Sequence, residues 1–311
     1  MIKWKKNAGD CIMLELIKKI DIHAHCAAFP DYVPRINENG LHLMGADEVI
    51  DFYDKLNVER GILLPITAPD AFWHTMTSEG CAHTAKTHPD RFSWFCGVDP
   101  RALENSSDSN LGILLEHYKS LGAIGCGELT ANIYADDKRI DNLFGYCAEF
   151  DLPVTIHIAH REGGCYGIID ELGLPRIRKM MKKHPKLKIF GHSMCFWSEI
   201  GENNDEIRHR YPKGKVQNGL LREMLYENEN LFCDMSAGSG ANAFMRDREH
   251  AAKFMEEFSD RLLYGCDACT KLYKFAFDFD EFLTSMRENG EIKDSTYRKI
   301  VRENAIRILN L

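Results

Sequence analysis

Eight apolar, β-rich runs alternate with amphipathic segments along almost the whole chain, and this alternation constrains the fold more than any other feature of the sequence. Four of the intervening segments, Asp47–Leu56, Leu111–Leu121, Ile140–Phe150 and His250–Phe258, have the 3.6-residue apolar periodicity of helices. Strands that alternate with helices form right-handed βαβ units and a parallel sheet, and eight such units close a barrel. The sequence therefore predicts an α/β fold, a (β/α)8 TIM barrel. The eight predicted strands are Lys19–His23, Arg60–Ile66, Phe92–Val98, Ala123–Glu128, Pro153–His157, Leu187–His192, Leu231–Met235 and Arg261–Asp267.

The chain has 311 residues, and no stretch rich in Pro, Gly or Ser divides it. We therefore expect residues 1–17 to form an N-terminal extension and residues 18–311 to form one barrel domain. The longest irregular stretches, Thr67–Ser78, Ala159–Gly167 and Ser193–Gly214, follow the second, fifth and sixth predicted strands. They leave the carboxyl ends of these strands, which is the face where barrels of this kind carry their active sites.

Composition excludes several classes of function. The 39 Lys and Arg against 47 Asp and Glu give a net charge of −8, which is opposite to the basic surface of a nucleic-acid-binding protein. No apolar run approaches the roughly 18 residues of a membrane span. Met1–Asp10 is basic and polar, and Cys11–Leu16 is too short for the apolar core of a signal peptide. With an odd count of 11 cysteines, we expect reduced thiols in a cytoplasmic protein.

The segment Asp21–His25 (DIHAH) carries the strongest local signal for chemistry. Side chains two residues apart on a strand point to the same face, so His23 and His25 are expected to aim together into the mouth of the barrel. Two converging imidazoles are typical of a metal site.

Three more strands end in residues of the same kind, which strengthens this interpretation. His157, His192 and Asp267 end the fifth, sixth and eighth predicted strands. In a closed barrel these strand ends surround one point, so residues far apart in the sequence meet in space. The set predicts a metal centre at the carboxyl end of the barrel.

These motifs resemble those of the amidohydrolase superfamily. DIHAH, TIHIAH, IFGH, LLYGCD and the closing ENAIRIL segment are similar in kind and order to its amidohydrolase-2 branch, which contains metal-dependent hydrolases and decarboxylases. The resemblance extends from about residue 18 to residue 311. It implies a divalent metal, with zinc as the first expectation and manganese as the alternative. It further implies that His23, His25, His157 and Asp267 contact the metal or its water, and that His192 is a second-metal ligand or an acid–base group.

Glu128 departs from the family pattern, because many members carry a carboxylated lysine at the end of the fourth strand. Here the residue is already a carboxylate, in the segment GCGELT. We expect it to be a bridging or direct metal ligand, since a carboxylate at this depth needs a cation. The alternative is a salt bridge across the barrel mouth. Two ions are expected if Glu128 and His192 both bind metal, and one ion if they do not.

Candidate substrate-binding residues lie in the loops after the strands. Arg161 could hold a substrate carboxylate through its bidentate guanidinium, with His160 beside it. Arg246 is a second candidate for an anion. The basic run Arg176–Lys188 is expected to be the solvated face of a helix instead. Further candidates for the pocket wall are Trp73, His74, Tyr166 and Trp197.

Three functions remain open from the sequence. The first is a metal-dependent hydrolase of a small-molecule amide, cyclic amide, ester or lactone, in which metal-activated water attacks, Asp267 is the general acid and base, and His192 orients the substrate or stabilises an oxyanion. The alternative is a metal-dependent decarboxylase of an aromatic or unsaturated acid, which an arginine beside a single metal would favour. The third is a non-catalytic metal-binding barrel. The expected partner is a small-molecule substrate, and whether barrels pair into a homo-oligomer is left open.

Overall fold

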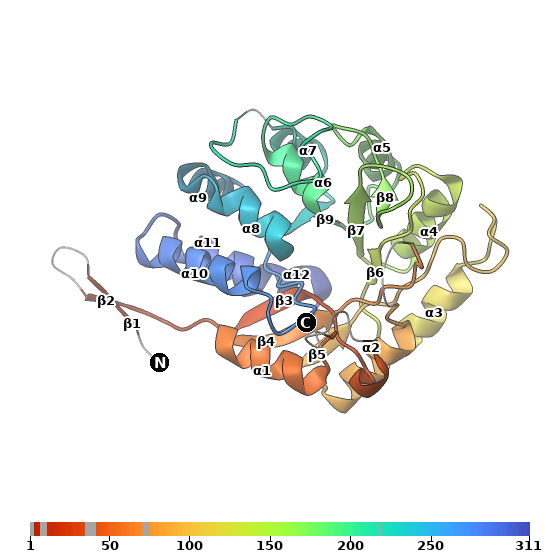
Figure 1. Ribbon diagram of the computed structural model, residues 1–311, viewed down its shortest axis with the longest axis horizontal. Coiled ribbons are helices and arrows are strands. Elements are labelled where there is room, and N and C mark those ends of the chain that lie inside the picture. Colours follow the sequence, from red (N-terminus) through yellow and green to blue (C-terminus); the bar gives the residue numbers. More distant parts are fainter. Residues whose placement is uncertain (1–2, 7–10, 35–41, 71–74, 218) are drawn as a thin grey trace.

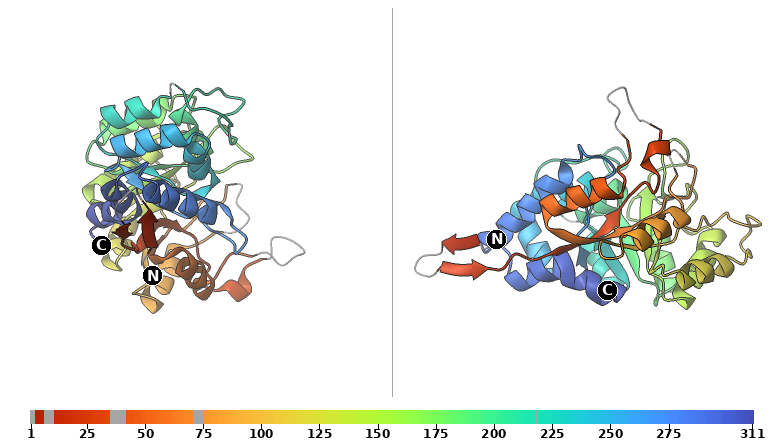
Figure 2. Two further views of the ribbon diagram at one scale, coloured as in Figure 1. Left: turned by 90° about the vertical axis from the view of Figure 1, so that its left-hand side faces the viewer. Right: turned by 90° about the horizontal axis from the view of Figure 1, so that it is seen from below.

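A computed structural model describes residues 3–6, 11–34, 42–70, 75–217 and 219–311, with only the backbone described before residue 15. The predicted candidates Trp73 and His74 lie outside the described residues. The strands β1 (Lys3–Lys6) and β2 (Cys11–Leu14) form an antiparallel pair that projects away from the rest of the molecule (Figures 1 and 2).

The other strands form the wall of a barrel, as predicted. Neighbouring strands are parallel in two groups, one in the order β3-β4-β5 and the other in the order β11-β10-β9-β7-β6. The barrel strands are β3 (Lys19–Ala24), β4 (Val58–Leu63), β5 (Phe92–Trp94), β6 (Cys126–Leu129), β7 (Val154–Ala159), β9 (Ile189–His192), β10 (Leu231–Asp234) and β11 (Leu262–Leu263). A short strand, β8 (Ile168–Ile169), pairs with the end of β7.

Backbone hydrogen bonds join these two groups on both sides and close the ring. Between β5 and β6, the Cys96 amide donates to the Gly125 carbonyl over 2.9 Å. Between β3 and the chain after β11, the Ile22 amide donates to Tyr264 over 3.1 Å and the Asp267 amide donates to His23 over 2.9 Å. The chain is therefore a (β/α)8 TIM barrel.

Helices follow the strands and cover the outside of the barrel (Figure 1). Buried apolar side chains between the helices and the wall make up the larger core. None of the described helices has the length and apolar character needed to span a lipid bilayer. The helices are α1 (Ala46–Leu56), α2 (Ser78–Thr87), α3 (Gly112–Ser120), α4 (Lys138–Glu149), α5 (Pro175–Lys183), α6 (Met194–Trp197), α7 (Leu221–Glu227), α8 (Ala237–Met245), α9 (Arg248–Glu257), α10 (Phe275–Glu288), α11 (Asp294–Arg298) and α12 (Asn304–Leu309), with single turns at Pro30–Tyr32, Ser198–Ile200 and Lys299–Glu303.

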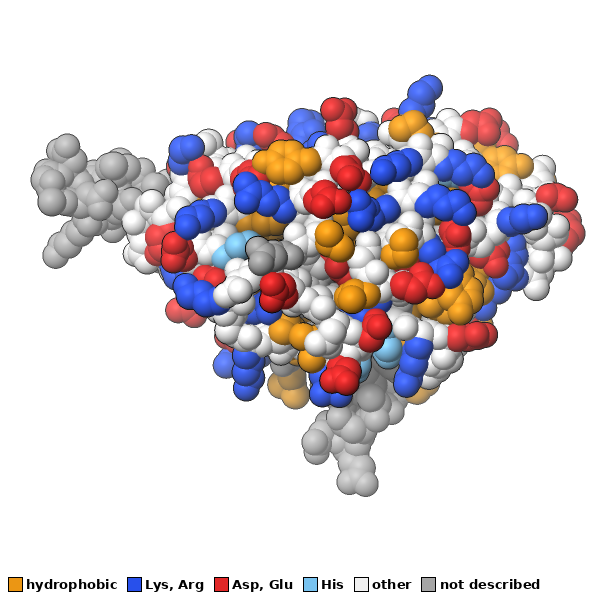
Figure 3. Space-filling model, turned by 90° about the horizontal axis from the view of Figure 1, so that it is seen from above, with side chains coloured by type: hydrophobic (Ala, Val, Ile, Leu, Met, Phe, Trp, Pro, Cys, Tyr) orange, Lys and Arg blue, Asp and Glu red, His pale blue; other side chains and the backbone are white. Residues whose placement is uncertain are grey.

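The basic run after residue 175 lies largely in α5 and has acidic neighbours. Arg176 pairs with Asp136 over 2.6 Å, and Arg178 pairs with Glu223 on α7 over 2.8 Å. Acidic and basic side chains are interspersed over this face (Figure 3). The run is the solvated face of a helix, as predicted.

A β-bulge in β3 changes which residues face the inside of the barrel. Ile20 and Ile22 belong to the interior apolar cluster, together with side chains from β4, β9, β10 and β11. The register of β3 against β4 then shifts between Asp21 and Ala24. Since a bulge re-aims the side chains that follow it, His23 and His25 also point inward. Simple alternation from Ile22 would have turned both histidines outward.

The eighth predicted strand is shorter than expected. Only Leu262–Leu263 pair with β10, after which the chain bonds to β3 instead. Asp267 then has a φ of 52°, a left-handed conformation that Asp tolerates better than most other residues. Asp267 therefore lies on a turn just beyond the strand.

Asp21 reinforces the seam where the barrel closes. Its buried Oδ1 accepts hydrogen bonds from the amides of His23 and Cys266, each over 2.9 Å. Its Oδ2 accepts from the Tyr53 hydroxyl on α1 over 2.7 Å. Burial raises the pKa of Asp21 to about 6, although these hydrogen bonds oppose the shift.

We predict that Tyr53→Phe lowers the free energy of unfolding by about 1–3 kcal/mol, because a buried carboxylate loses a donor. Because burial raises the folded-state pKa of Asp21 to about 6, its contribution to stability is complete below pH 4 and is lost as the pH rises through 6. The Tyr53 hydroxyl stabilises the ionised form of Asp21 and so limits this loss of stability. Tyr53→Phe should therefore lower the free energy of unfolding more at pH 8 than at pH 5. Urea unfolding at both pH values measures the effect. Tyr226→Phe, at an exposed tyrosine, is the control, and equal losses at both pH values would contradict the prediction.

Candidate metal centre

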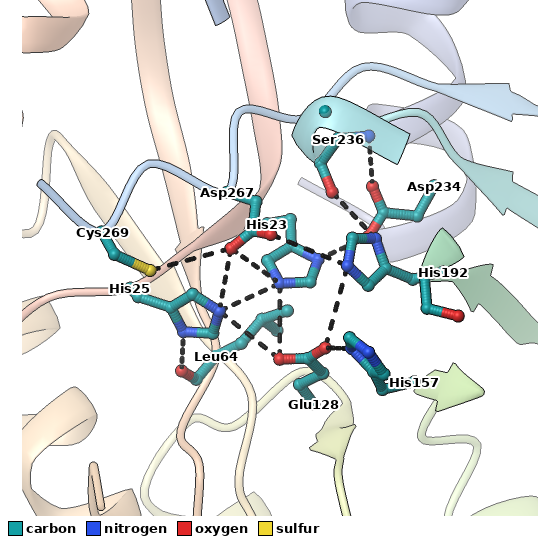
Figure 4. A network of polar contacts seen from close by, with 12 residues as sticks. His23, His25, Leu64, Glu128, His157, His192, Asp234, Ser236, Asp267 and Cys269 are labelled. Atoms are coloured by element: carbon teal, nitrogen blue, oxygen red, sulfur yellow. Dashed lines mark hydrogen bonds and ion pairs between the residues drawn. The ribbon is translucent and has the colours of Figure 1, made fainter. Parts of the chain in front are cut away.

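The predicted metal-binding side chains meet at the carboxyl ends of the barrel strands (Figure 4). Two β-bulges aim them: the bulge in β3 turns His23 and His25 inward, and a register shift in β6 between Cys126 and Leu129 spans Glu128. The remaining members come from β7, β9 and the turn after β11. The whole set is His23, His25, Glu128, His157, His192 and Asp267.

Four donor atoms form a compact first set. The Nε2 atoms of His23 and His25 are 3.0 Å apart, and Glu128 Oε2 lies 3.6 and 3.5 Å from them. Asp267 Oδ1 lies 3.6 Å from His23 Nε2 and 3.3 Å from His25 Nε2. Ligands at about 2.0–2.2 Å from a tetrahedral ion are about 3.4 Å from one another. The spacing of each carboxylate oxygen from the two imidazole nitrogens is therefore close to that around a divalent ion.

The second oxygen of each carboxylate faces a different pair of histidines. Glu128 Oε1 lies 2.6 Å from His157 Nδ1 and 3.8 Å from His192 Nε2. Asp267 Oδ2 lies 3.7 Å from His192 Nε2. Glu128 and Asp267 thus connect the first donor set to a second, looser set.

Hydrogen bonds on the far side of each ring fix which nitrogen faces the centre. His25 Nδ1 donates to the Leu64 carbonyl over 3.0 Å, and His23 Nδ1 donates to Asp234 Oδ2 over 2.5 Å. Both Nε2 atoms therefore face the site, where each would offer a lone pair to a metal once its proton is displaced. His192 Nδ1 lies 3.1 Å from Ser236 Oγ, which likewise leaves its Nε2 facing inward.

Sequence reasoning missed Asp234, the fully buried carboxylate that orients His23. It ends β10, so its position as a polar residue at the end of an apolar strand was the available signal. Such a carboxylate behind a ligating imidazole raises the basicity of the ligand.

The side chains of the cluster shift one another's pKa values. Burial alone would lower the pKa of His25, but hydrogen bonds to Asp267 and Glu128 outweigh it and raise this pKa to about 9. Burial would also lower the pKa of His23, yet the charges of Asp234 and Asp267 hold it well above its usual range. Burial and the charge of His23 instead lower the pKa of His192 to about 4.

The carboxylates stay ionised for the same reason. Burial would raise the pKa of Glu128, but the charge of His157 and the hydrogen bonds from the neighbouring imidazoles lower it well below its usual value. The opposing charge of His23 lowers the pKa of Asp267 and Asp234 despite their burial. The buried Glu128 and Asp234 and the part-buried Asp267 need positive charge nearby, and neutral imidazoles with carboxylates are ligands that divalent metals accept. The residues therefore fit a divalent metal.

The cluster opens into a cavity of about 390 Å3. His160 and Tyr166, two of the candidate substrate-binding residues, line it. Tyr166 packs against the ring of His157 with 4.5 Å between centroids. The His160 ring stacks on the ring of His209, with 4.4 Å between centroids. His209 was not among the predicted residues. Tyr211, Tyr273, Ser239 and Cys269 also line the cavity and were not predicted.

Three candidates for substrate binding lie elsewhere. Trp197 is buried in α6, and its indole donates to the Asp234 carbonyl over 2.8 Å, so it supports the carboxylate instead of lining the cavity. Arg161 is exposed, and Arg246 is half-buried at the end of α8, close to Gly201. None of the three lines the cavity, which their positions after strands could not reveal.

A sequence model of a protein family described as "Amidohydrolase" matches residues 20–311. No curated protein matches the chain.

Solved structures share the fold at low sequence identity. A 2,6-dihydroxybenzoate decarboxylase from Rhizobium is 17% identical with a TM-score of 0.62, over 95% of this chain and 99% of that one. A 5-carboxyvanillate decarboxylase from Novosphingobium aromaticivorans, complexed with manganese, is 18% identical with a TM-score of 0.61, over 94% and 96%. An uncharacterised TIM-barrel protein from Bordetella bronchiseptica is 15% identical with a TM-score of 0.63, over 94% and 99%.

We predict that metal affinity rises with pH between 6 and 8, by about tenfold per unit for each proton displaced. The reason is that the carboxylates keep His23 and His25 protonated until a metal replaces the protons. Competition with a chelating dye at several pH values measures the slope. His25→Gln should flatten it, whereas His83→Gln, at an exposed histidine, should not. An affinity independent of pH would contradict this account of the site.

Proposed function

This chain belongs to the amidohydrolase family, and we propose that it is a metal-dependent decarboxylase of a hydroxylated aromatic acid. The observation that carries the proposal is that the metal-binding cluster opens directly into a cavity walled by Tyr166, Tyr211 and Tyr273. Aromatic walls of this kind suit a planar ring, which they contact through stacked or edge-on geometry.

Structural relatives support the same class of substrate. Two of the solved structures with this fold are decarboxylases of 2,6-dihydroxybenzoate and of 5-carboxyvanillate, and the latter contains manganese. Imidazole-rich sites suit zinc, whereas carboxylates suit manganese. We infer that either ion fills the first donor set and leaves His157 and His192 available to the substrate.

A divalent ion in the first set would bind oxygen atoms of the acid and polarise them. Asp267, one of the four residues of that set, would take a proton from a substrate hydroxyl and return it to the ring carbon. The bond between ring and carboxylate breaks, carbon dioxide leaves, and the electron pair left on the carbon accepts this proton. His192 stays neutral at pH 7, because burial and the charge of His23 lower its pKa to about 4, so it serves better as a hydrogen-bonding group than as the acid.

A hydrolase is the second candidate, and Glu128 favours it. Its two oxygens face two donor sets, the geometry expected of a carboxylate that bridges two ions. Two ions about 3.5–4 Å apart suit the activation of water for hydrolysis. In addition, neither Arg161 nor Arg246 lines the cavity, although either would have favoured decarboxylation.

We predict that protein loaded with manganese or zinc releases carbon dioxide from at least one of a panel of hydroxybenzoates, measured by a coupled assay. Asp267→Asn should lower turnover by about 10²–10⁴-fold, because the proton carrier is lost. Metal analysis of this variant must show that it retains its ion. Hydrolysis of lactones or cyclic amides without any release of carbon dioxide would contradict the decarboxylase.

Metal content distinguishes the two candidates. We expect one tightly bound ion per chain in the wild type, with Glu128→Gln weakening its binding because the first donor set loses a charged ligand. Elemental analysis after dialysis measures the ratio. Two ions in the wild type and one in Glu128→Gln would contradict the single-ion decarboxylase and favour the hydrolase.

A further inference from the structure

One cysteine lies at the metal centre but belongs to neither of the two donor sets described above. Cys269 follows Asp267 by two residues on the turn after β11, and its side chain lines the cavity. Its carbonyl accepts a hydrogen bond from the Met44 amide over 3.1 Å, and its side chain packs against a small apolar cluster that contains Leu43 and Met76. Both its backbone and its side chain are therefore held in place beside the centre.

The thiol of Cys269 points at a carboxylate of the centre. Its Sγ lies 3.9 Å from Asp267 Oδ1, to which the thiol donates (Figure 4). His25 Nε2 lies 3.3 Å from the same oxygen, and the donor atoms of the three residues all lie within 4.8 Å of one another. Around a tetrahedral zinc ion, a sulfur at about 2.3 Å and an oxygen at about 2.1 Å are about 3.6 Å apart. The three donors are therefore spaced for one ion that is slightly larger than zinc.

This group of three donors, which we call the thiol position, faces the cavity. His25, Asp267 and Cys269 all line the cavity. His23, in contrast, is fully buried and is not among the described residues that line it. An ion held by three protein ligands at a cavity wall keeps a coordination position open to water or to a small molecule.

The thiol position and the first donor set suit different ions. The first donor set offers two imidazoles and two carboxylates, which suit manganese and zinc. The thiol position offers a sulfur in place of His23 and Glu128, and thiolate sulfur selects thiophilic ions. His25 Nε2 belongs to both groups, and its lone pair binds only one ion at a time. An ion in one position therefore excludes an ion from the other.

We propose that His25, Asp267 and Cys269 form an alternative binding position for a thiophilic divalent ion such as cadmium, which displaces manganese from the first donor set. When the ion binds, the thiol proton passes to solvent and the thiolate becomes the ligand. The inference rests on the metal centre and not on the assignment of the reaction, so it applies to a decarboxylase and to a hydrolase alike.

The test titrates cadmium into the full chain, metal-free and loaded with manganese, by calorimetry. We expect one cadmium ion to release one manganese ion, as measured by elemental analysis after gel filtration. Difference absorption should show the ultraviolet charge-transfer band of a cadmium–thiolate bond. Cys269→Ser should remove this band and lower cadmium affinity by about tenfold or more, because a hydroxyl is a poor ligand for a thiophilic ion. Its manganese affinity should stay within about twofold of the wild type, because the first donor set is intact.

Cys165→Ser is the matched control, because this thiol also lines the cavity but donates to the Arg161 carbonyl over 3.3 Å. It should change neither the band nor the affinities. Cadmium that binds without the band, keeps the band in Cys269→Ser, or binds without releasing manganese overturns the thiol position but not the proposed function. Equal losses of cadmium and manganese affinity in Cys269→Ser also overturn it, since they indicate a damaged site. Manganese that does not bind to the wild type overturns the metal centre, and with it both the proposed function and the thiol position.

Discussion

Three carboxylates at one end of the barrel, two of them buried and one part-buried, are the constraint on which the site depends. Glu128, Asp234 and Asp267 lie within a few ångströms of four imidazoles, and the barrel wall excludes most water from them. Uncompensated charge in such a place would oppose folding. The imidazoles offset it through hydrogen bonds and protonation, and a divalent ion would replace those protons. The imidazoles that compensate the charge of the carboxylates are therefore also the groups that would bind the metal.

Two irregular points in the backbone position the side chains of the metal-binding cluster. A bulge in β3 allows Ile22 to fill the barrel interior while His23, the next residue, faces the metal centre. A similar register shift in β6, between Cys126 and Leu129, includes Glu128. Asp21 then bonds across the seam between β3 and the end of β11, so the strand that carries two of the histidines is held on both sides.

Much of the fold and of the metal-binding cluster could be predicted from the sequence, because the strand ends of a closed barrel converge whatever path the loops take. The alternation of elements and the polar residues at the strand ends were sufficient for the barrel and for six of the clustered side chains. The bulge was not visible, since it depends on register against β4. Asp234 was overlooked inside an apolar strand. Trp197 and Arg246 were assigned to the pocket because they follow strands in the sequence, whereas Trp197 lies in α6 and Arg246 directly follows α8, and neither lines the cavity.

Anomalous diffraction from crystals grown with manganese or zinc, recorded at the corresponding absorption edge, tests the central claim most directly. The account predicts an anomalous peak among His23 Nε2, His25 Nε2, Glu128 and Asp267, at bonding distances of about 2.0–2.2 Å. A fully loaded crystal without any peak at this cluster, or with its ions bound only elsewhere on the chain, would contradict the claim that these buried charges form a metal centre.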